Sequence, residues 1–248
     1  MITAVVLTHN EEKNIVDCLE SVKWCDQILV IDDDSQDKTA ELSEKEKAEV
    51  IRESLGGNFS KQRNIGLERA RNEWVLFVDA DERITDSLRY EIQSTVADPM
   101  NFYSGFLIKR RDVMWGKQLR HGEAGSASFL RLAKRGAGKW EGLVHEKWKI
   151  KGRVGKLRNS IQHFPHSTIA QFLAEINLYT DIRSRELYKK GVGANFLSIA
   201  LHTKVKFLQN YLVKRGFLDG IPGIMSATLM SFHAFLVRGK LWLLWQKD

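Results

Sequence analysis

Two carboxylates, Asp79 and Asp81, stand one residue apart directly after an apolar run at residues 74–78. Val, Phe and Trp favour the core of a pleated sheet, so this run predicts a buried strand that ends at the acidic pair. In an open α/β sheet, ligands bind just beyond the carboxyl ends of such strands. Carboxylate oxygens there would suit Mg²⁺ or Mn²⁺, which proteins often hold with one or two carboxylates plus substrate phosphates. An acidic turn without a ligand is the alternative interpretation.

The residues before this run supply the other elements that such a sheet requires. Three more apolar stretches predict strands, and helical segments alternate with them, in the order 2–7 (strand), 12–24 (helix), 27–31 (strand), 35–47 (helix), 49–52 (strand) and 60–70 (helix). A β-α-β order of this kind predicts a mostly parallel sheet with right-handed crossovers.

Polar side chains also follow the first two predicted strands. Thr8, Asn10 and Glu11 come after the first strand, and Asp33 comes after the second. A nucleotide that lies across a sheet edge needs such groups, because they can accept hydrogen bonds from base N–H groups and ribose hydroxyls. Each cluster alone could be capping chemistry, but their shared position at the strand ends favours a nucleotide site.

Composition indicates a globular protein with a sizeable core, since 43% of residues are apolar and 28% are charged. The net charge of +7 is concentrated in residues 191–248, where seven Lys or Arg face two Asp. Such a segment suits nucleic acid, an anionic membrane or an anionic substrate. The two cysteines form no C-x-x-C pattern and are expected to be structural thiols. The short apolar N-terminus lacks a basic leader, which predicts a first strand and a cytosolic protein.

Motifs of other nucleotide-binding classes are missing or altered. The sequence has no G-x-G-x-x-G after its first strand and no G-x-x-x-x-G-K-[ST], which disfavours dinucleotide oxidoreductases and P-loop NTPases. Arg83 stands where a haloacid-dehalogenase-type phosphatase would have Thr or Val after its D-x-D pair.

Three motifs, T-H-N-E at 8–11, I-D-D-D-S-Q-D-K-T at 31–39 and F-V-D-A-D-E-R at 77–83, resemble the inverting family 2 glycosyltransferases of the GT-A fold. The resemblance implies that the nucleoside pocket is lined by Thr8, Asn10, Glu11 and Asp33. It further implies that Asp79 faces the ribose or the metal, and that Asp81 binds the metal bridging the diphosphate. In S-K-Q-R-N-I-G at 60–66, Lys61 or Arg63 would approach the diphosphate, with a solvated helix face as the alternative.

The segment W-E-G-L-V-H-E-K-W at 140–148 is the next one with possible chemistry. Inverting transfer needs a carboxylate base for the acceptor hydroxyl, and Glu146 fits that role, with Glu141 as the second candidate. His145 would be a third metal ligand. The G-x-V-H-E pattern resembles a motif in part of the family, whereas the E-D pair of many relatives is absent. A surface loop remains the alternative.

The second half changes pattern. Residues 102–110, 126–134 and 157–164 predict strands, and Ser167 would cap a helix that runs to about 190. His163 and His166 flank a proline before that helix, which predicts either a structural turn or a metal site. We therefore expect a GT-A catalytic domain at 1–165, with a nucleotide-sugar half at 1–100 and an acceptor half at 101–165, and a helical, basic and aromatic membrane-associating region at 166–248.

Residues 221–237 contain no formally charged side chain. An interfacial amphipathic segment, a buried core or dimer helix and a membrane span are all compatible with this stretch. Trp and basic residues together favour an anionic membrane surface, and no nucleic-acid motif accompanies the charge, so no nucleic acid partner is expected.

The predicted fold class is α/β, namely a GT-A (Rossmann-like), mostly parallel sheet flanked by helices, with added strands and a C-terminal helical membrane-associated segment. Within the family, the chain resembles the bacterial lipopolysaccharide-core β-1,4-glucosyltransferases. That resemblance implies transfer of glucose from UDP-glucose to a heptose of the lipid-anchored inner core, with Mg²⁺ or Mn²⁺, at the inner face of the cytoplasmic membrane. The alternatives are another family 2 transferase, such as one acting on a polyprenyl phosphate, and a non-catalytic nucleotide-sugar binding module.

Overall fold

Parallel strands form one half of the main sheet in the computed structural model, which describes residues 1–54, 56, 58–123, 125, 127–142, 146–165 and 168–246. These strands are β1 (Ile2–Thr8), β2 (Gln27–Asp32), β3 (Glu49–Arg52) and β4 (Trp74–Asp79). β1 lies between β2 and β4, and β3 pairs with β2. All seven residues of β1 are buried, as expected for a parallel strand covered on both faces.

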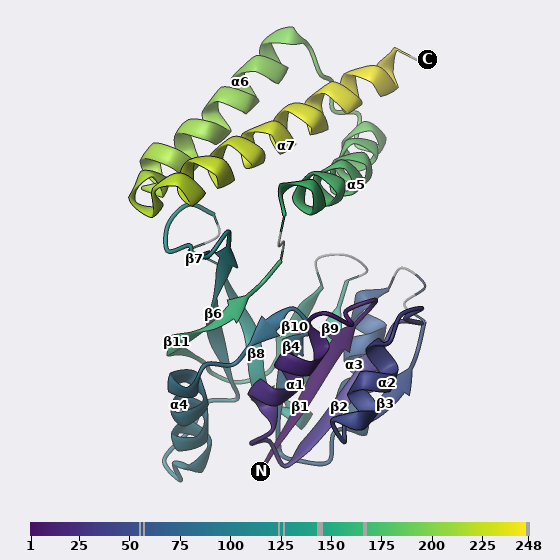
Figure 1. Cartoon of the computed structure of the whole chain (residues 1–248), viewed down its shortest axis with the longest axis vertical. Helices are drawn as coiled ribbons and strands as arrows, with labels where there is room; N and C mark the ends of the chain where they lie inside the picture. Colours follow the sequence, from purple (N-terminus) through teal and green to yellow (C-terminus); the bar gives the residue numbers. More distant parts are fainter. Residues whose placement is uncertain are drawn as a thin grey trace. The chain divides into compact units, whose positions relative to one another are not determined.

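Helices cover both faces of this parallel half (Figure 1). They are α1 (Ile15–Val22), α2 (Thr39–Lys45) and α3 (Phe59–Arg69). Residues of α1 pack with Ala4 and Val6, whereas Leu67 of α3 packs with Val5 and Leu7, so alternate β1 side chains enter different cores. Gly66 permits close approach of α3, because a Cβ there would lie 2.5 Å from Cγ1 of Val5.

Antiparallel strands extend the sheet beyond β4. They are β5 (Glu82–Arg83), β6 (Gly105–Met114), β8 (Ser128–Lys134) and β11 (Val154–His163). The strand order is β3-β2-β1-β4-β8-β6-β11-β5, and β8 pairs antiparallel with β4. The helix α4 (Asp86–Ala97) contacts β11. The mixed α/β architecture predicted from the sequence is confirmed.

A separate two-stranded ribbon, β9 (Gly138–Glu141) and β10 (Lys147–Ile150), covers the α3 side of the sheet. Trp140 and Trp148 stack with ring centroids 5.4 Å apart, and both rings meet Phe77 of β4 edge-on at 5.1 and 5.0 Å. These aromatic contacts hold the ribbon, and with it the flanking acidic residues, against the end of β4.

The chain divides into two compact units. Residues 1–110 and 128–163 form the first, and residues 111–127 and 164–248 form the second. The sequence had assigned all of 101–165 to the catalytic domain, whereas residues 111–127 pack with the C-terminal helices. The physical reason lies in a buried carboxylate of the second unit. Asp219 accepts hydrogen bonds from the backbone N–H groups of Arg120 (3.0 Å) and His121 (2.8 Å).

The second unit contains α5 (Ile169–Lys189), α6 (Phe196–Leu208) and α7 (Ile221–Trp245), with β7 (Lys117–Gln118) paired to the end of β6. The side chain of Thr168 caps α5 by accepting from the N–H of Gln171, and the predicted cap Ser167 lies outside the described residues. α7 contacts both α5 and α6. It continues beyond the uncharged stretch, and the ammonium of Lys240 reaches Asp181 of α5 at 2.8 Å. By length and composition, α7 could cross a membrane.

Candidate active site

A tight turn carries Asp79 and Asp81 at the end of β4. The N–H of Ala80 donates to the carbonyl of Leu7 (3.0 Å), which ties the turn to β1. The N–H of Asp79 donates to Oε2 of Glu82 (3.0 Å), so the side chain of the next strand closes the turn. Both aspartates therefore lie at the carboxyl edge of the parallel strands, where the apolar run and the acidic pair had placed them.

Arg131 of β8 donates hydrogen bonds to both carboxylate oxygens of Asp79. Its guanidinium forms a two-point contact with the carboxylate, including Nη1 to Oδ1 at 3.2 Å, and Nη2 also donates to Oε1 of Glu82 (3.0 Å). Burial favours the neutral form of Asp79, but the guanidiniums of Arg131 and Arg63 outweigh it and hold the pKa of Asp79 well below its usual range. Glu82 is fully buried, and this burial raises its pKa although Arg131 opposes the change.

Replacing Arg131 with Met is expected to lower the free energy of unfolding by about 3–5 kcal/mol, because two acidic groups lose a buried counter-charge. Arg131 is only 4% exposed, and water cannot take over its role. Urea denaturation provides the measurement. Arg158→Met, at an exposed position of β11, is the matched control and should change stability by less than about 0.5 kcal/mol. Equal stability of both variants would show that Arg131 does not compensate these carboxylates.

Within the described part of this site, Asp81 has one carboxylate oxygen without a hydrogen bond. Its Oδ2 lies 3.1 Å from Nε2 of His163, while its Oδ1 is buried and has no hydrogen-bond partner among the described residues. His163 arrives through the antiparallel pairing of β11 with β5, which places it opposite Glu82. A buried, unpaired carboxylate oxygen is costly unless a ligand satisfies it.

This arrangement fits a divalent cation that takes part of its coordination from a substrate. Within the described part of the chain, no three His, Cys, Asp or Glu side chains are gathered as a complete protein cage. Mg²⁺ commonly binds through one or two carboxylates together with phosphate oxygens and water. Asp81, through its unpartnered oxygen, is the carboxylate that fits this description, with Asp79 next to it in the same turn although both of its oxygens are engaged by guanidiniums. His145, the histidine predicted as third ligand, lies outside the described residues.

Arg63 connects the aspartate pair to the candidate base. Its Nε donates to Oε1 of Glu146 (2.7 Å) and its Nη2 to Oδ1 of Asp79 (3.1 Å). The guanidinium also lies over the ring of Trp140, 4.6 Å from the centroid, and the residue is 6% exposed. A buried, stacked guanidinium presents its donors in a fixed direction. Glu146 thus belongs to the same network as Asp79.

The other candidates for this region face solvent. Glu141 in β9 forms an ion pair with Lys149 (2.7 Å), and the hydrogen bond from Lys149 lowers the pKa of Glu141. A carboxylate with a lowered pKa is a weaker base. Lys61 lies in the first turn of α3, where its exposed ammonium pairs with Glu53, so Arg63 is the buried cation of this helix.

The four residues predicted for the nucleoside lie where β1 and β2 end side by side. The N–H of Asp33 donates to the carbonyl of Thr8 (2.9 Å). Asn10 has a left-handed backbone (φ 54°), and its Oδ1 accepts from the N–H of Gln36 (2.8 Å). Glu11 accepts from the side chain of its neighbour Asn14 (2.7 Å). Oγ1 of Thr8 is buried without a hydrogen-bond partner in the described structure.

Comparison with known proteins places this chain in a family. It matches glycosyl transferase family 2 over residues 3–173, more than half of its length, and therefore belongs to that family and is a glycosyltransferase. The lipopolysaccharide core biosynthesis glycosyltransferase LpsC of Rhizobium meliloti is 26% identical over 97% of this chain and 92% of its own. An uncharacterised glycosyltransferase of Rickettsia bellii is also 26% identical, over 97% of this chain and 85% of its own.

Solved structures agree on the fold. The structure of residues 1–349 of S. aureus TarS with UDP-GlcNAc aligns over all of this chain and 92% of that one, with a TM-score of 0.51 and 16% identity. The family resemblance inferred from the motifs is confirmed.

Sequence reasoning did not assign Arg131 or Glu82 to the site. A signal for Arg131 was present, since an arginine between Leu130 and Leu132 in a predicted strand is a charge that burial would force to find a partner. His163 had been considered as a turn residue or a ligand of a separate metal site with His166. Its proximity to Asp81 depends on a long-range strand pairing that no local pattern encodes.

Proposed function

We propose that this family 2 glycosyltransferase transfers glucose from UDP-glucose, with inversion, to a heptose of the lipid-anchored lipopolysaccharide inner core. The observation that carries the proposal is the network of Asp79, Arg63 and Glu146 beside the unpaired oxygen of Asp81. This network connects the aspartates that could hold a metal-bound diphosphate to a second carboxylate, Glu146, that could act on the acceptor. The similarity to LpsC supports the acceptor class.

Each group has a role in donor binding. The nucleoside lies against Thr8, Asn10, Glu11 and Asp33, and Lys61 in the first turn of α3 would exchange its ion pair with Glu53 for the diphosphate. Asp81 and Asp79, with His163 or His145, would hold Mg²⁺ or Mn²⁺, which would supply positive charge against the diphosphate of the donor. Arg131 keeps Asp79 ionised and oriented, so that its carboxylate is ready for the donor.

Glu146 is the proposed base. It takes the proton from the acceptor hydroxyl while that oxygen attacks the anomeric carbon on the face opposite the diphosphate, which inverts the configuration. Arg63 positions Glu146 through Nε. Glu141 is the second candidate, although its ion pair with Lys149 engages it at the surface.

The acceptor determines where the enzyme works. A lipid-anchored glycan is met at a membrane, so we place the protein on the cytoplasmic side, peripheral to the inner face of the cytoplasmic membrane. The second unit is then the membrane-associating region. A polyprenyl phosphate acceptor would demand the same location.

The first experiment is calorimetric titration with UDP, GDP and dTDP, with and without Mn²⁺, followed by a transfer assay with UDP-glucose and a heptose-terminated core oligosaccharide. We expect Mn²⁺-dependent binding of UDP and formation of a glucosylated product detected by mass spectrometry. Preference for another nucleotide would exclude UDP-glucose. Binding of UDP-glucose without turnover on heptose or polyprenyl phosphate acceptors would favour a non-catalytic module.

A further inference from the structure

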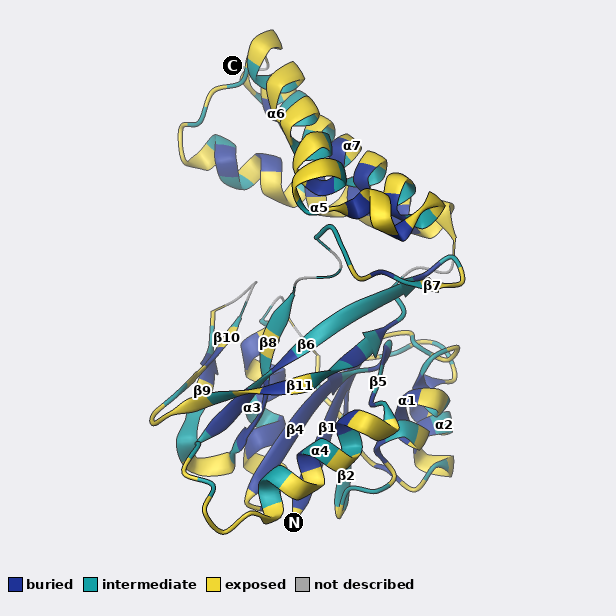
Figure 2. Cartoon of the chain, turned by 90° about the vertical axis from the view of Figure 1, so that its left-hand side faces the viewer, coloured by how far each residue is buried: buried dark blue, intermediate teal, exposed yellow. Residues whose placement is uncertain are grey.

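One face of α6 exposes a row of apolar side chains. No residue of α6 is buried, and in Figure 2 the helix is coloured mainly as exposed. The α6 stripe consists of Leu197, Leu201, Val205 and Leu208, which are 70%, 54%, 51% and 38% exposed. Their spacing of four, four and three residues places them on a single side of the helix.

The exposed apolar surface continues into the connection between α6 and α7. The 212–221 turn displays the apolar side chains of Leu212, Val213, Phe217, Leu218 and Ile221, each between 45% and 76% exposed. Large contiguous apolar patches are uncommon on monomeric soluble proteins and, where they occur, usually mark a binding surface.

The 212–221 turn is an ordered structure rather than a loose loop. Asp219, within this turn, is buried and accepts hydrogen bonds from the backbone of Arg120 and His121, which follow β7 in the β6–β7 hairpin segment (the hairpin, residues 111–123), while the N–H of Gly122 donates to the carbonyl of Lys214 (3.0 Å). Two glycines complete the packing, since a Cβ on Gly223 would lie 2.0 Å from the carbonyl oxygen of Gly216. The polar groups of the turn therefore form hydrogen bonds within the second unit, while its apolar side chains are exposed to solvent.

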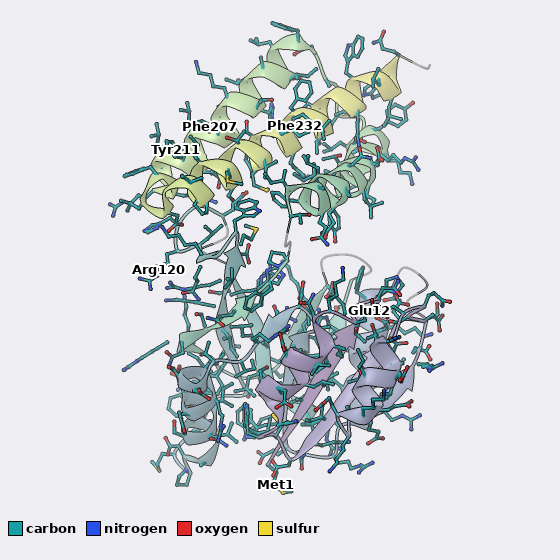
Figure 3. All side chains as sticks on the ribbon, in the orientation of Figure 1. Met1, Glu12, Arg120, Phe207, Tyr211 and Phe232 are labelled. Carbon is teal, nitrogen blue, oxygen red and sulfur yellow. The ribbon has the colours of Figure 1, made fainter. Side chains whose placement is uncertain are left out.

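Basic residues are frequent in the two segments that form and adjoin this apolar surface. Residues 111–123 and 206–224 contain six Lys or Arg and three acidic residues. Of the acidic three, Asp219 is buried and Glu123 pairs with Lys206 and Lys214. Arg215 and Arg120 are exposed, and Figure 3 shows Arg120 with Phe207 in α6 and Tyr211 in the helical turn that follows it.

We propose that the α6 stripe and the 212–221 turn dock on an anionic phospholipid bilayer. The apolar side chains enter the boundary between headgroups and acyl chains, and Arg120, Lys214 and Arg215 contact the headgroup phosphates. The positive charge of this surface favours an anionic bilayer as its partner over a second copy of the chain, because self-association would bring these cations close to one another and they would repel. The inference deepens the proposed function, on which it rests for the identity of the membrane, and it assigns docking to α6 rather than to insertion of α7.

Co-sedimentation of the full chain with lipid vesicles tests the docking surface. We expect the protein to bind vesicles of phosphatidylcholine with about one third phosphatidylglycerol at least about tenfold more tightly than pure phosphatidylcholine, and to lose this preference in high salt. Leu201→Glu/Leu208→Glu and Arg120→Glu/Arg215→Glu should each weaken binding about tenfold or more. The controls are Tyr90→Glu, an exposed residue of α4, and Lys151→Glu/Lys156→Glu, which changes net charge equally in the first unit.

Three results would overturn the proposal. They are the absence of vesicle binding, unchanged binding of both double variants, and a lipid-free dimer that Leu201→Glu/Leu208→Glu dissociates, which would make the surface a contact between copies. Circular dichroism and UDP titration of each variant show whether it is folded. Because vesicle binding needs neither donor nor turnover, its outcome is separate from that of the transfer assay.

Discussion

Replacing Glu146 with Gln is expected to reduce sugar transfer by about 10²–10⁴-fold while leaving UDP affinity within about twofold of the wild type. Glutamine keeps the size of the side chain and an oxygen that accepts from Nε of Arg63, so the network with Asp79 stays intact. It cannot accept the proton of the acceptor hydroxyl. Initial rates of product formation and calorimetric titration with UDP measure the two quantities separately.

The matched control is Glu141→Gln. Glu141 faces solvent and pairs with Lys149, so its amide should leave transfer close to the wild-type rate. The reverse pattern, with an active Glu146→Gln enzyme and an inactive Glu141→Gln enzyme, would move the base to β9. If both variants turn over normally, the base lies elsewhere, and the unassigned carboxylates of the site must be tested in turn.

Asp81→Ala should remove the metal-dependent part of UDP affinity, a loss of more than about 100-fold, because even groups that only support metal ligands are worth 10–100-fold. The same change should leave the unfolding temperature equal or higher. Oδ1 of Asp81 is buried without a partner in the described structure, so folding without metal carries the cost of that oxygen, and alanine removes the cost. Loss of function together with unchanged or increased stability is typical of a binding residue.

Titration of UDP with and without Mn²⁺, together with thermal unfolding in chelator, provides both measurements. Asp98→Ala, at the exposed end of α4, controls for removal of a negative charge and should change neither quantity. A variant that binds UDP with unchanged Mn²⁺ dependence would exclude Asp81 as a ligand. A variant that is clearly less stable would indicate that its contact with His163 serves the fold.

The parallel half of the sheet was predictable from sequence because its strands are buried on both faces. Continuous apolar runs then coincide with strands, and the predicted runs 2–7 and 74–78 became Ile2–Thr8 and Trp74–Asp79. Each predicted run was one residue shorter than the observed strand, because the last residue of a strand at a binding edge is polar and does not extend the apolar pattern. The acidic pair was recognisable because it directly follows one of these continuous apolar runs.

The rest of the site depends on pairing between distant strands. Arg131 reaches Asp79 because β8 joins the sheet antiparallel beside β4, and His163 reaches Asp81 because β11 pairs with β5. Neither β8 nor β11 contains a local sequence pattern that identifies the strand with which it pairs. The helical end of the chain was difficult for another reason. α6 carries apolar residues at helical spacing yet buries none of them, so its pattern alone does not tell whether that face packs on a core or stays exposed.

The insertion of residues 111–127 between two strands of the sheet has a consequence for protein engineering. The chain passes between the two units after Arg110, Ala127 and His163, so the hairpin is encoded within the catalytic unit although its partner, Asp219, is encoded near the C-terminus. A truncation at residue 165 deprives the hairpin of that partner. A chimera with only a relative's C-terminal helices joins a native hairpin to a foreign carboxylate, so the two segments must be exchanged together.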